Sequence, residues 1–114
     1  MARRRMERIA HNESLFRALN ESLEANVHRG RPDGDRAGFV CECGDPACDE
    51  TVRVELPAYE SVRADAHLFI VLPGHEAPDV EDVVSARGDG YVVVRKHADA
   101  AKIVERTDPR RKRR

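Results

Sequence analysis

The sequence contains no tryptophan, few aromatic residues and no long apolar run. Only 4% of its 114 residues are aromatic, while 36% are charged. Its longest apolar stretch, Leu68–Leu72, is far shorter than the roughly 20 residues that a membrane-spanning helix needs. The basic N-terminus also lacks the apolar segment of a secretory signal. These absences predict a cytoplasmic protein that does not associate with membranes, and the length fits one small domain.

The sequence also lacks the motifs of several common catalytic sites. It has no glycine-rich phosphate-binding loop, since Gly88-Asp89-Gly90 indicates only a turn. The zinc-deaminase pattern, a His-x-Glu upstream of a Pro-Cys-x-x-Cys, is absent because the sequence has no Pro-Cys-x-x-Cys. No Ser/His/Asp order indicates a nucleophilic triad. We therefore expect that the protein is not an enzyme.

Charge is segregated along the chain. Residues 1–8 carry four Arg and one Glu, and residues 106–114 carry five Arg, one Lys and one Asp. The residues between them include 10 basic and 19 acidic side chains. We interpret residues 1–11 as a basic N-terminal segment and residues 107–114 as a basic C-terminal tail. Such ends are either solvated or contact a polyanion such as nucleic acid.

Residues 12–106 are expected to form a single zinc-binding α+β domain. Apolar residues recur at helical spacing from Ile9 to Val27, which predicts a long N-terminal helix whose apolar stripe faces the core. The helix is long for so small a domain, so the alternative is that part of it packs on another chain. The first residues of this helix should fray, because consecutive arginines oppose its dipole. Gly30 and Pro32 should end it, and a flexible loop should follow through Gly38.

The second half of the domain alternates between predicted strands and short helices. β-Branched and alternating runs predict two strands and then a β-hairpin around the Gly-Asp-Gly turn. A proline in a first helical turn predicts a short helix, and a further short helix should close the domain. The predicted strands are residues 51–56, 67–72, 80–86 and 91–96, and the predicted helices begin at Pro57 and Ala98. We expect a small, mostly antiparallel sheet, stabilised by zinc, with a long N-terminal and a short C-terminal helix.

All three cysteines of the chain lie within eight residues. Cys41 and Cys43 are separated by one residue, and Cys48 follows after a turn that contains glycine and proline. An odd number of cysteines in a reducing cytoplasm argues against a disulfide framework. Clustered thiolates bind Zn²⁺ strongly, and a closed structural site needs four ligands. The cluster therefore predicts a Zn²⁺ site whose fourth ligand is a histidine, a carboxylate or water.

His75 is the preferred candidate for the fourth ligand. It lies in a Pro-Gly turn directly after a predicted buried strand, where a loop can reach a neighbouring loop, and Glu76 could accept the imidazole N–H. His67 opens the same strand and is a possible alternative. The other histidines are expected at the surface: His11, His28 and His97.

Other chemistry for the cysteines stays open at this point. An iron–sulfur cluster normally uses four cysteines, so histidine would have to replace one. A redox switch through a Cys41–Cys43 disulfide would form a strained ring. The leading interpretation is a zinc-binding interaction or regulatory module with a structural Cys3His site and a protein partner. The alternatives are a nucleic-acid-binding or transcription-associated protein that uses its basic tails, and a thiol or metal sensor.

Several segments together resemble a group of short uncharacterised proteins of high-GC Gram-positive bacteria. The segments that carry the resemblance are NESLFRALNESLE (residues 12–24), FVCECGDPAC (39–48), YESVRAD (59–65), FIVLPGHE (69–76), VEDVV (80–84), GYVVVRK (90–96) and TDPR (107–110). The combination is distinctive although no single segment is. The resemblance implies a small cytoplasmic protein with a cysteine-rich site and a paired histidine in the PGHE segment.

Overall fold

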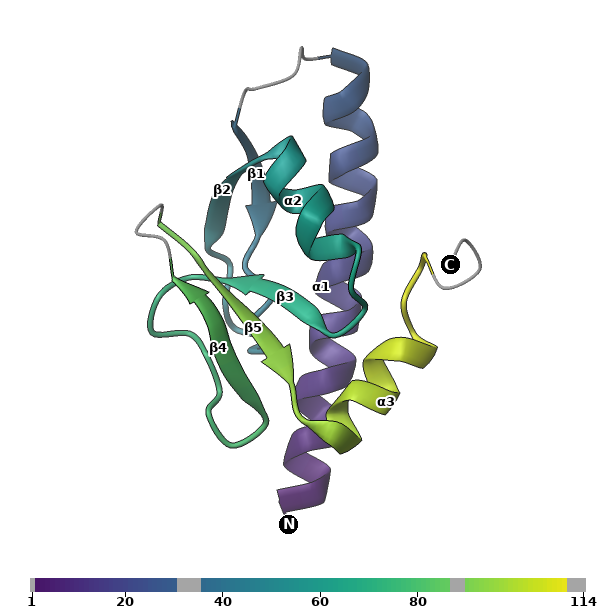
Figure 1. Cartoon of the computed structure of the whole chain (residues 1–114), viewed down its shortest axis with the longest axis vertical. Coiled ribbons are helices and arrows are strands. Elements are labelled where there is room, and N and C mark those ends of the chain that lie inside the picture. The colour runs from purple at the N-terminus through teal and green to yellow at the C-terminus, as the bar shows by residue number, and fades with distance from the viewer. Residues whose placement is uncertain (1, 31–35, 87–89, 111–114) are drawn as a thin grey trace.

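The computed structural model describes residues 2–30, 36–86 and 90–110, and within them it has an α+β fold (Figure 1). The long N-terminal helix, the antiparallel strands and the short C-terminal helix are confirmed. The elements are α1 (Ala2–Gly30), β1 (Arg36–Val40), β2 (Thr51–Glu55), α2 (Leu56–Arg63), β3 (Leu68–Val71), β4 (Glu81–Ala86), β5 (Val92–Lys96) and α3 (Ala98–Arg106). None of the described helices is both long and apolar enough to cross a membrane.

The strands form two antiparallel sheets rather than one. β1 pairs with β2, and β5 lies between β3 and β4 in the second sheet. β1 begins at Arg36, inside the predicted loop, because Arg36–Gly38 continue the ladder opposite Arg53–Glu55. The predicted hairpin is confirmed as β4 and β5, with a register shift between Val83 and Ser85. Figure 1 shows α1 running beside the strands along the whole length of the fold, with α2 and one end of β3 in front of it.

Aromatic and β-branched side chains from both sheets form the core. Phe39 on β1 stacks on Tyr59 of α2, with ring centroids 4.3 Å apart and an interplanar angle of 7°. The inward residues of β2 alternate with exposed ones, as the sequence predicts. Fully buried residues of the core include Phe39, Val52, Val54, Tyr59, Phe69, Ile70, Val71, Val94 and Val104.

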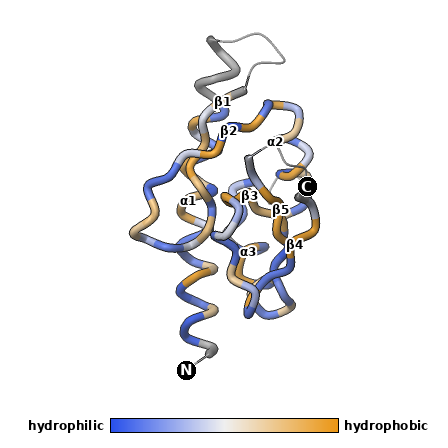
Figure 2. The backbone as a smooth tube through the Cα atoms, turned by 90° about the vertical axis from the view of Figure 1, so that its left-hand side faces the viewer, coloured by the Kyte–Doolittle hydropathy of each residue, from blue (hydrophilic) through white to orange (hydrophobic). Residues whose placement is uncertain are grey.

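The face of α1 that turns toward the core is polar, so the predicted apolar core stripe is wrong in part. Ile9 is buried and Leu23 packs partly against the core, but Leu15 is 68% exposed and Leu19 is 48% exposed. Figure 2 shows α1 mostly in the hydrophilic colour, with short hydrophobic segments between. The buried polar residues of α1 are Glu13, Ser14, Arg17, Asn20 and Glu24.

Arg17 shows why a polar helix face is buried here. Its guanidinium lies 4.5 Å above the centre of the Phe69 ring. It donates hydrogen bonds of 2.6 Å to the carbonyl oxygens of Ala66 and Val104. The Val104 carbonyl belongs to the last turn of α3, where helix carbonyls have no partner within the helix. Because α1 covers such backbone ends, its inner face must supply hydrogen bonds as well as apolar contact.

The N-terminal turns of α1 are helical and attached to the body. The helix begins at Ala2, so it runs without interruption through the expected boundary between residues 11 and 12. The expectation that its first turns fray is not met in the described residues. Arg5 forms two hydrogen bonds with the Asp79 carboxylate, at 2.8 and 3.2 Å. An acidic partner from another loop therefore offsets part of the unfavourable basic charge at this helix end.

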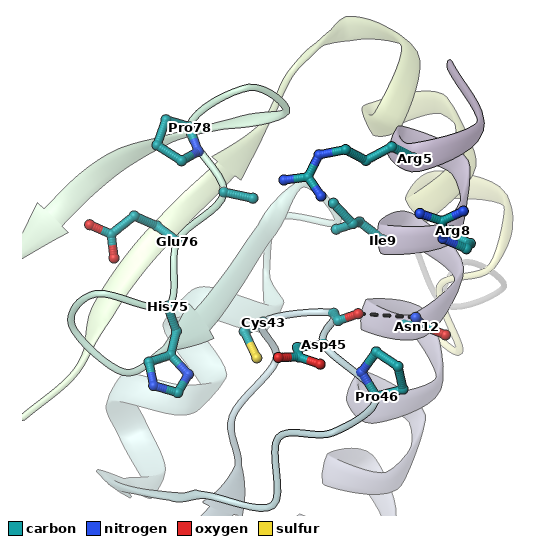
Figure 3. A pocket seen from close by; sticks show the side chains of 12 residues that line it. Arg5, Arg8, Ile9, Asn12, Cys43, Asp45, Pro46, His75, Glu76 and Pro78 are labelled. Carbon is teal, nitrogen blue, oxygen red and sulfur yellow. Dashed lines mark hydrogen bonds between the residues drawn. The ribbon is translucent and has the colours of Figure 1, made fainter. Parts of the chain in front are cut away.

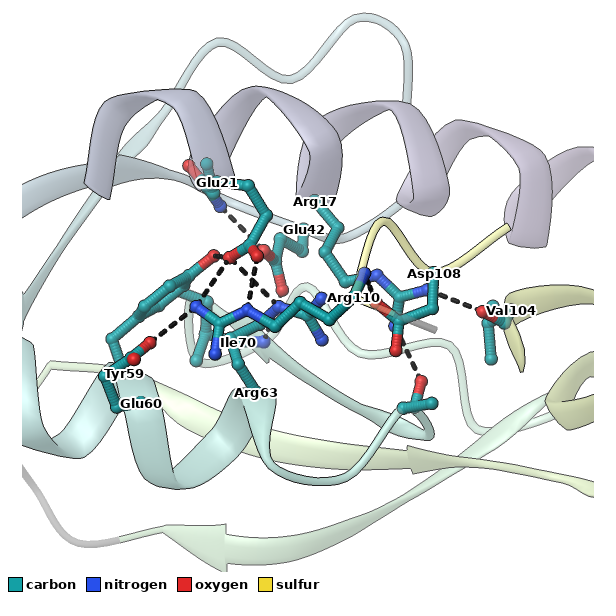
Figure 4. A network of polar contacts seen from close by, with 12 residues as sticks. Arg17, Glu21, Glu42, Tyr59, Glu60, Arg63, Ile70, Val104, Asp108 and Arg110 are labelled. Carbon is teal, nitrogen blue, oxygen red and sulfur yellow. Dashed lines mark hydrogen bonds and ion pairs between the residues drawn. The ribbon is translucent and has the colours of Figure 1, made fainter. Parts of the chain in front are cut away.

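The described part of the predicted C-terminal tail packs against the domain. Thr107 and Ser14 share a hydrogen bond of 2.6 Å between their hydroxyl groups. The buried Asp108 accepts a hydrogen bond of 2.6 Å from Arg63 Nη2 (Figure 4). Arg110 pairs with the carboxylates of Glu21 and Glu60. The positive charge of Arg110 is thus used inside the protein, and residues 111–114 lie outside the described part.

Glu21 is the centre of this network, which joins α1, α2 and the C-terminal segment. It accepts a hydrogen bond from the Tyr59 hydroxyl at 2.8 Å and faces Arg63 Nε at 3.3 Å (Figure 4). Burial raises the pKa of Glu21, but hydrogen bonds from Arg110 and Tyr59 and the charge of Arg63 outweigh it and lower the pKa overall. Glu21 is therefore ionised at neutral pH and holds three elements together.

Candidate metal centre

Two loops bring three thiols and one imidazole together. The cysteine loop, residues 41–50, joins β1 to β2 and carries Cys41, Cys43 and Cys48. The histidine loop, residues 72–80, joins β3 to β4 and carries His75. One potential ligand atom from each of these four residues lies within 4.8 Å of all the others. These are the four residues that the sequence analysis singled out.

The spacing of the four ligand atoms fits a tetrahedral zinc ion. His75 Nδ1 lies 3.7 Å from the sulfur of Cys41 and 3.7 Å from the sulfur of Cys48. Zn–S bonds of about 2.3 Å and Zn–N bonds of about 2.0–2.1 Å, arranged as a tetrahedron, place sulfur and nitrogen about 3.6 Å apart. The donor set is therefore already close to the geometry that the ion requires.

A tight turn in the cysteine loop folds Cys48 back toward the other two thiols. The Cys48 N–H donates to the Asp45 carbonyl at 3.0 Å, and the Asp45 side chain accepts from Ala47 N–H at 2.9 Å. Gly44 starts the turn with φ of +79°, a conformation that favours glycine. A Cβ atom on Gly44 would lie 2.8 Å from Ile9 Cγ2. Glycine is therefore needed here both for the turn and for close contact with α1.

Glu42, which lies between two of the cysteines, anchors the loop to β3 and α1. Its side chain is fully buried and accepts hydrogen bonds from Ile70 N–H at 3.0 Å and Asn20 Nδ2 at 2.7 Å. Its own N–H donates to the Ile70 carbonyl at 2.9 Å. Burial raises the pKa of Glu42, and the hydrogen bonds that its side chain accepts from Asn20 and Ile70 offset part of this effect. The resulting pKa is about 7. Glu42 thus fixes the backbone between Cys41 and Cys43.

Two asparagines of α1 form hydrogen bonds with the two ends of the segment from Val40 to Gly44. The hydropathy pattern of the sequence predicts neither contact. Asn12 donates to the Gly44 carbonyl at 3.0 Å. Asn20 donates to the Val40 carbonyl at 3.0 Å and accepts from the Val40 N–H at 2.8 Å. Polar residues in a helix are normally assigned to its solvent face, so the sequence analysis did not identify them. Together with Glu42 they position the cysteines from α1.

The local electrostatics favour a cation among the thiols. Burial raises the pKa of the Cys41 thiol, despite a hydrogen bond from Leu72 N–H, which lies 3.3 Å from its sulfur. Burial likewise raises the pKa of Cys43, although the backbone N–H of Asp45 lowers it. Cys43 and Cys48 raise the pKa of Cys41 further, and Cys48 does the same for Cys43, whereas a hydrogen bond with Cys41 lowers the pKa of Cys43. A divalent cation removes this obstacle by compensating the thiolate charges.

The histidine loop turns sharply so that His75 Nδ1 faces the sulfurs. Gly74 has φ of +90°, and the His75 N–H donates to the Leu72 carbonyl at 3.0 Å. The Glu76 carboxylate accepts from Gly74 N–H at 2.8 Å. Glu76 therefore braces the turn, which differs from the expected role as acceptor for the imidazole.

The other described histidines lie outside the cluster. His67 contacts Glu105, with 2.5 Å between Nε2 and Oε2, and is not brought to the thiols. His97 pairs with Asp82 at 3.2 Å. His11 is exposed, as predicted, and the side chain of His28 lies outside the described residues. The structure therefore favours His75 over His67 as the fourth candidate ligand.

A cleft of about 390 Å³ opens beside the cluster (Figure 3). Cys43 and His75 lie on one side, and the first turns of α1 supply Arg5 and Arg8 on the other. Asp45 and Glu76 also line it, so both signs of charge are present. The cleft shows that part of the cluster borders solvent, but its mixed charge does not select a ligand class.

Comparison of the chain with protein-family models, curated proteins and solved structures finds no match.

Proposed function

We propose that the protein binds one Zn²⁺ through Cys41, Cys43, Cys48 and His75, and that the ion stabilises the fold by joining the cysteine loop to the histidine loop. The observation that carries this proposal is the approach of four ligand atoms, from loops far apart in sequence, to within 4.8 Å of one another. Burial raises the pKa of Cys41 and Cys43, so without a cation these thiols would stay protonated. A bound divalent cation would hold them as thiolates.

The donor set supports zinc and a structural role. Three sulfurs and one nitrogen suit Zn²⁺ in a tetrahedral site, whereas Mg²⁺ and Ca²⁺ prefer oxygen ligands. Four protein ligands fill the tetrahedron, and a catalytic zinc needs an open position for water or substrate. The proposed site therefore serves stability and not catalysis.

The wider role that we propose is a small cytoplasmic interaction or regulatory module with a protein partner. The exposed Leu15 and Leu19, one helical turn apart on α1, support contact with an apolar surface of that partner. The nucleic-acid alternative is less well supported, because Arg110 of the basic tail is paired with Glu21 and Glu60. The module would depend on zinc to keep its two loops in place.

Protein purified without added metal is expected to contain one zinc ion per chain by elemental analysis. The double variant Cys41→Ser/His75→Ala should contain less than a tenth of that amount, because two of four ligands are lost. Asp49→Ser is a matched control, since Asp49 is exposed in the same loop and is not one of the four. Wild-type protein that is folded and free of zinc after this purification would contradict the proposal.

A mild peroxide treatment of the same samples separates a structural site from a sensor. In a sensor, two thiolates lose two electrons to form one disulfide, the peroxide is reduced to water, and zinc is released. Cys48 is only partly buried, so an oxidant can reach at least one sulfur. For the structural role we expect zinc to stay bound during minutes of exposure. Rapid release that a thiol reductant reverses would favour the sensing alternative.

A further inference from the structure

Three charged side chains form a buried cluster between the two loops of the metal centre. Lys96, at the end of β5, contacts Glu13 of α1 and Glu81 of β4 through its ammonium group. All three side chains have no solvent exposure. Charged groups are rarely buried unless they are paired, because each loses its hydration. The cluster therefore links three elements that could separate only by leaving a charge unpaired.

Glu81 connects the cluster to the histidine loop. Its Oε2 accepts a hydrogen bond of 2.9 Å from the N–H of Ala77, two residues after His75. The Ala77 carbonyl in turn accepts from Val80 N–H at 3.0 Å and from Glu81 N–H at 3.1 Å. Both polar backbone groups of Ala77 are thus held close to Glu81. The end of the turn that presents His75 is fixed to the residue that Lys96 contacts.

Glu13 connects the cluster to the cysteine loop. A Cβ atom on Gly44 would lie 3.0 Å from Glu13 Cγ, so the backbone next to Cys43 rests directly on this side chain. The adjacent Asn12 holds the Gly44 carbonyl at 3.0 Å. A shift of Glu13 would therefore move the support beneath the loop that carries the thiols.

Burial favours the uncharged form of Glu13 in this cluster. Burial raises the pKa of Glu13 well above its usual range, and the neighbouring Glu81 raises it further, whereas Lys96 lowers it. With Glu13 protonated, one ammonium faces one carboxylate and one neutral carboxyl group. The cluster is then electrically neutral and can stay buried as a rigid link.

We propose that Glu13, Lys96 and Glu81 are positioning residues for the metal centre, which hold the two loops at the separation that a tetrahedral ion requires. This inference rests on the proposed zinc site. Groups that orient metal ligands without touching the ion commonly change metal affinity by about 10–100-fold when they are replaced. We expect a loss of this size for Lys96→Met, because methionine fills the space but cannot bridge the two carboxyl groups.

The test measures zinc affinity of the full chain by competition with a chromophoric chelator, together with resistance to urea. Lys96→Met and Glu81→Gln are compared with Asp108→Asn, which removes the charge from a different buried ion pair, with Arg63. All three variants should unfold at lower urea than the wild type. Only Lys96→Met and Glu81→Gln should also bind zinc at least about 10-fold more weakly. If these residues only stabilised the fold, their replacement would lower zinc affinity no more than Asp108→Asn does.

The possible results of this test distinguish a failure of the positioning role from a failure of the proposed zinc site. Zinc affinities that fall equally in Asp108→Asn and Lys96→Met, at equal loss of urea resistance, would overturn the positioning role. If Lys96→Met does not fold, Glu81→Gln decides, because glutamine preserves the size of the side chain. Unchanged affinity in Glu81→Gln then counts against the inference. Wild-type protein that does not bind zinc would instead refute the proposed metal site itself.

Discussion

Replacement of Cys43 by serine is expected to remove zinc binding and lower the midpoint of thermal unfolding by about 10 °C or more, equivalent to at least about 2 kcal/mol. Cys43 is buried, and its sulfur is one of the four atoms gathered between the two loops. Serine is a poor zinc ligand, so three donors would be left around the ion. The two loops would then depend on their hydrogen bonds alone.

Treatment with a chelator distinguishes the effect of losing the metal from the effect of losing the Cys43 thiol. Wild-type protein treated with a strong chelator should unfold at nearly the same temperature as Cys43→Ser, and the variant should not respond to chelator at all. Asp49→Ser should match untreated wild type to within about 0.5 kcal/mol, since Asp49 is exposed. Equal unfolding temperatures for wild type with and without chelator would mean that no stabilising ion is present.

Arg63→Met is expected to destabilise the protein by about 3–5 kcal/mol while leaving one zinc bound per folded chain. The Arg63 side chain has no solvent exposure and pairs with Asp108 at 2.6 Å and with Glu21 at 3.3 Å. Asp108 is also fully buried, so the substitution removes the buried cation that pairs with its carboxylate. Urea denaturation, with the zinc content of the folded fraction measured in parallel, checks both parts.

The control for this variant is the same substitution at a surface arginine, Arg95. Arg95→Met removes an exposed pair with Asp65, whose atoms lie 3.0 Å apart, and should cost less than about 1 kcal/mol. If Arg63→Met is no more destabilising than Arg95→Met, the network around Glu21 does not hold the C-terminal segment. Burial of the pair would then have no energetic consequence, which contradicts the account of the fold given above.

The cysteines of the site are predictable from sequence because ligands close in the chain are also close in space. Cys41, Cys43 and Cys48 are linked by a short loop, and glycine and proline make the turn possible. His75 required a further step, since its position depends on how β3 places the histidine loop beside the cysteine loop. The Pro-Gly turn after a buried strand was sufficient to favour His75 over the other four histidines.

The inner face of α1 could not be predicted in the same way. Hydrophobic periodicity assumes that apolar residues face the core and polar residues face solvent. Here Arg17 and Asn20 are buried because they satisfy backbone groups at Val104 and Val40. Such pairing depends on the tertiary structure and leaves no periodic signal in the sequence. For the same reason Leu19, which belongs to the predicted apolar stripe, is exposed, as is Leu15 beside it.

The C-terminal segment shows a similar limit. A run of arginines around a single acid indicates a solvated tail or a polyanion contact. Whether Arg110 is free depends on the presence of acidic groups opposite it, and the structure supplies Glu21 and Glu60. The division of the strands into two sheets likewise depends on which strands pair in the folded chain, which strand propensity does not contain.

The central claim is that one zinc ion is held by three sulfurs and one nitrogen. X-ray absorption at the zinc edge, measured on protein purified without added metal, tests it most directly. We predict a shell of three sulfurs at about 2.3 Å and one nitrogen at about 2.0–2.1 Å, with the nitrogen contribution lost in His75→Ala. A zinc shell made only of oxygen and nitrogen, or one that His75→Ala leaves unchanged, would contradict the account.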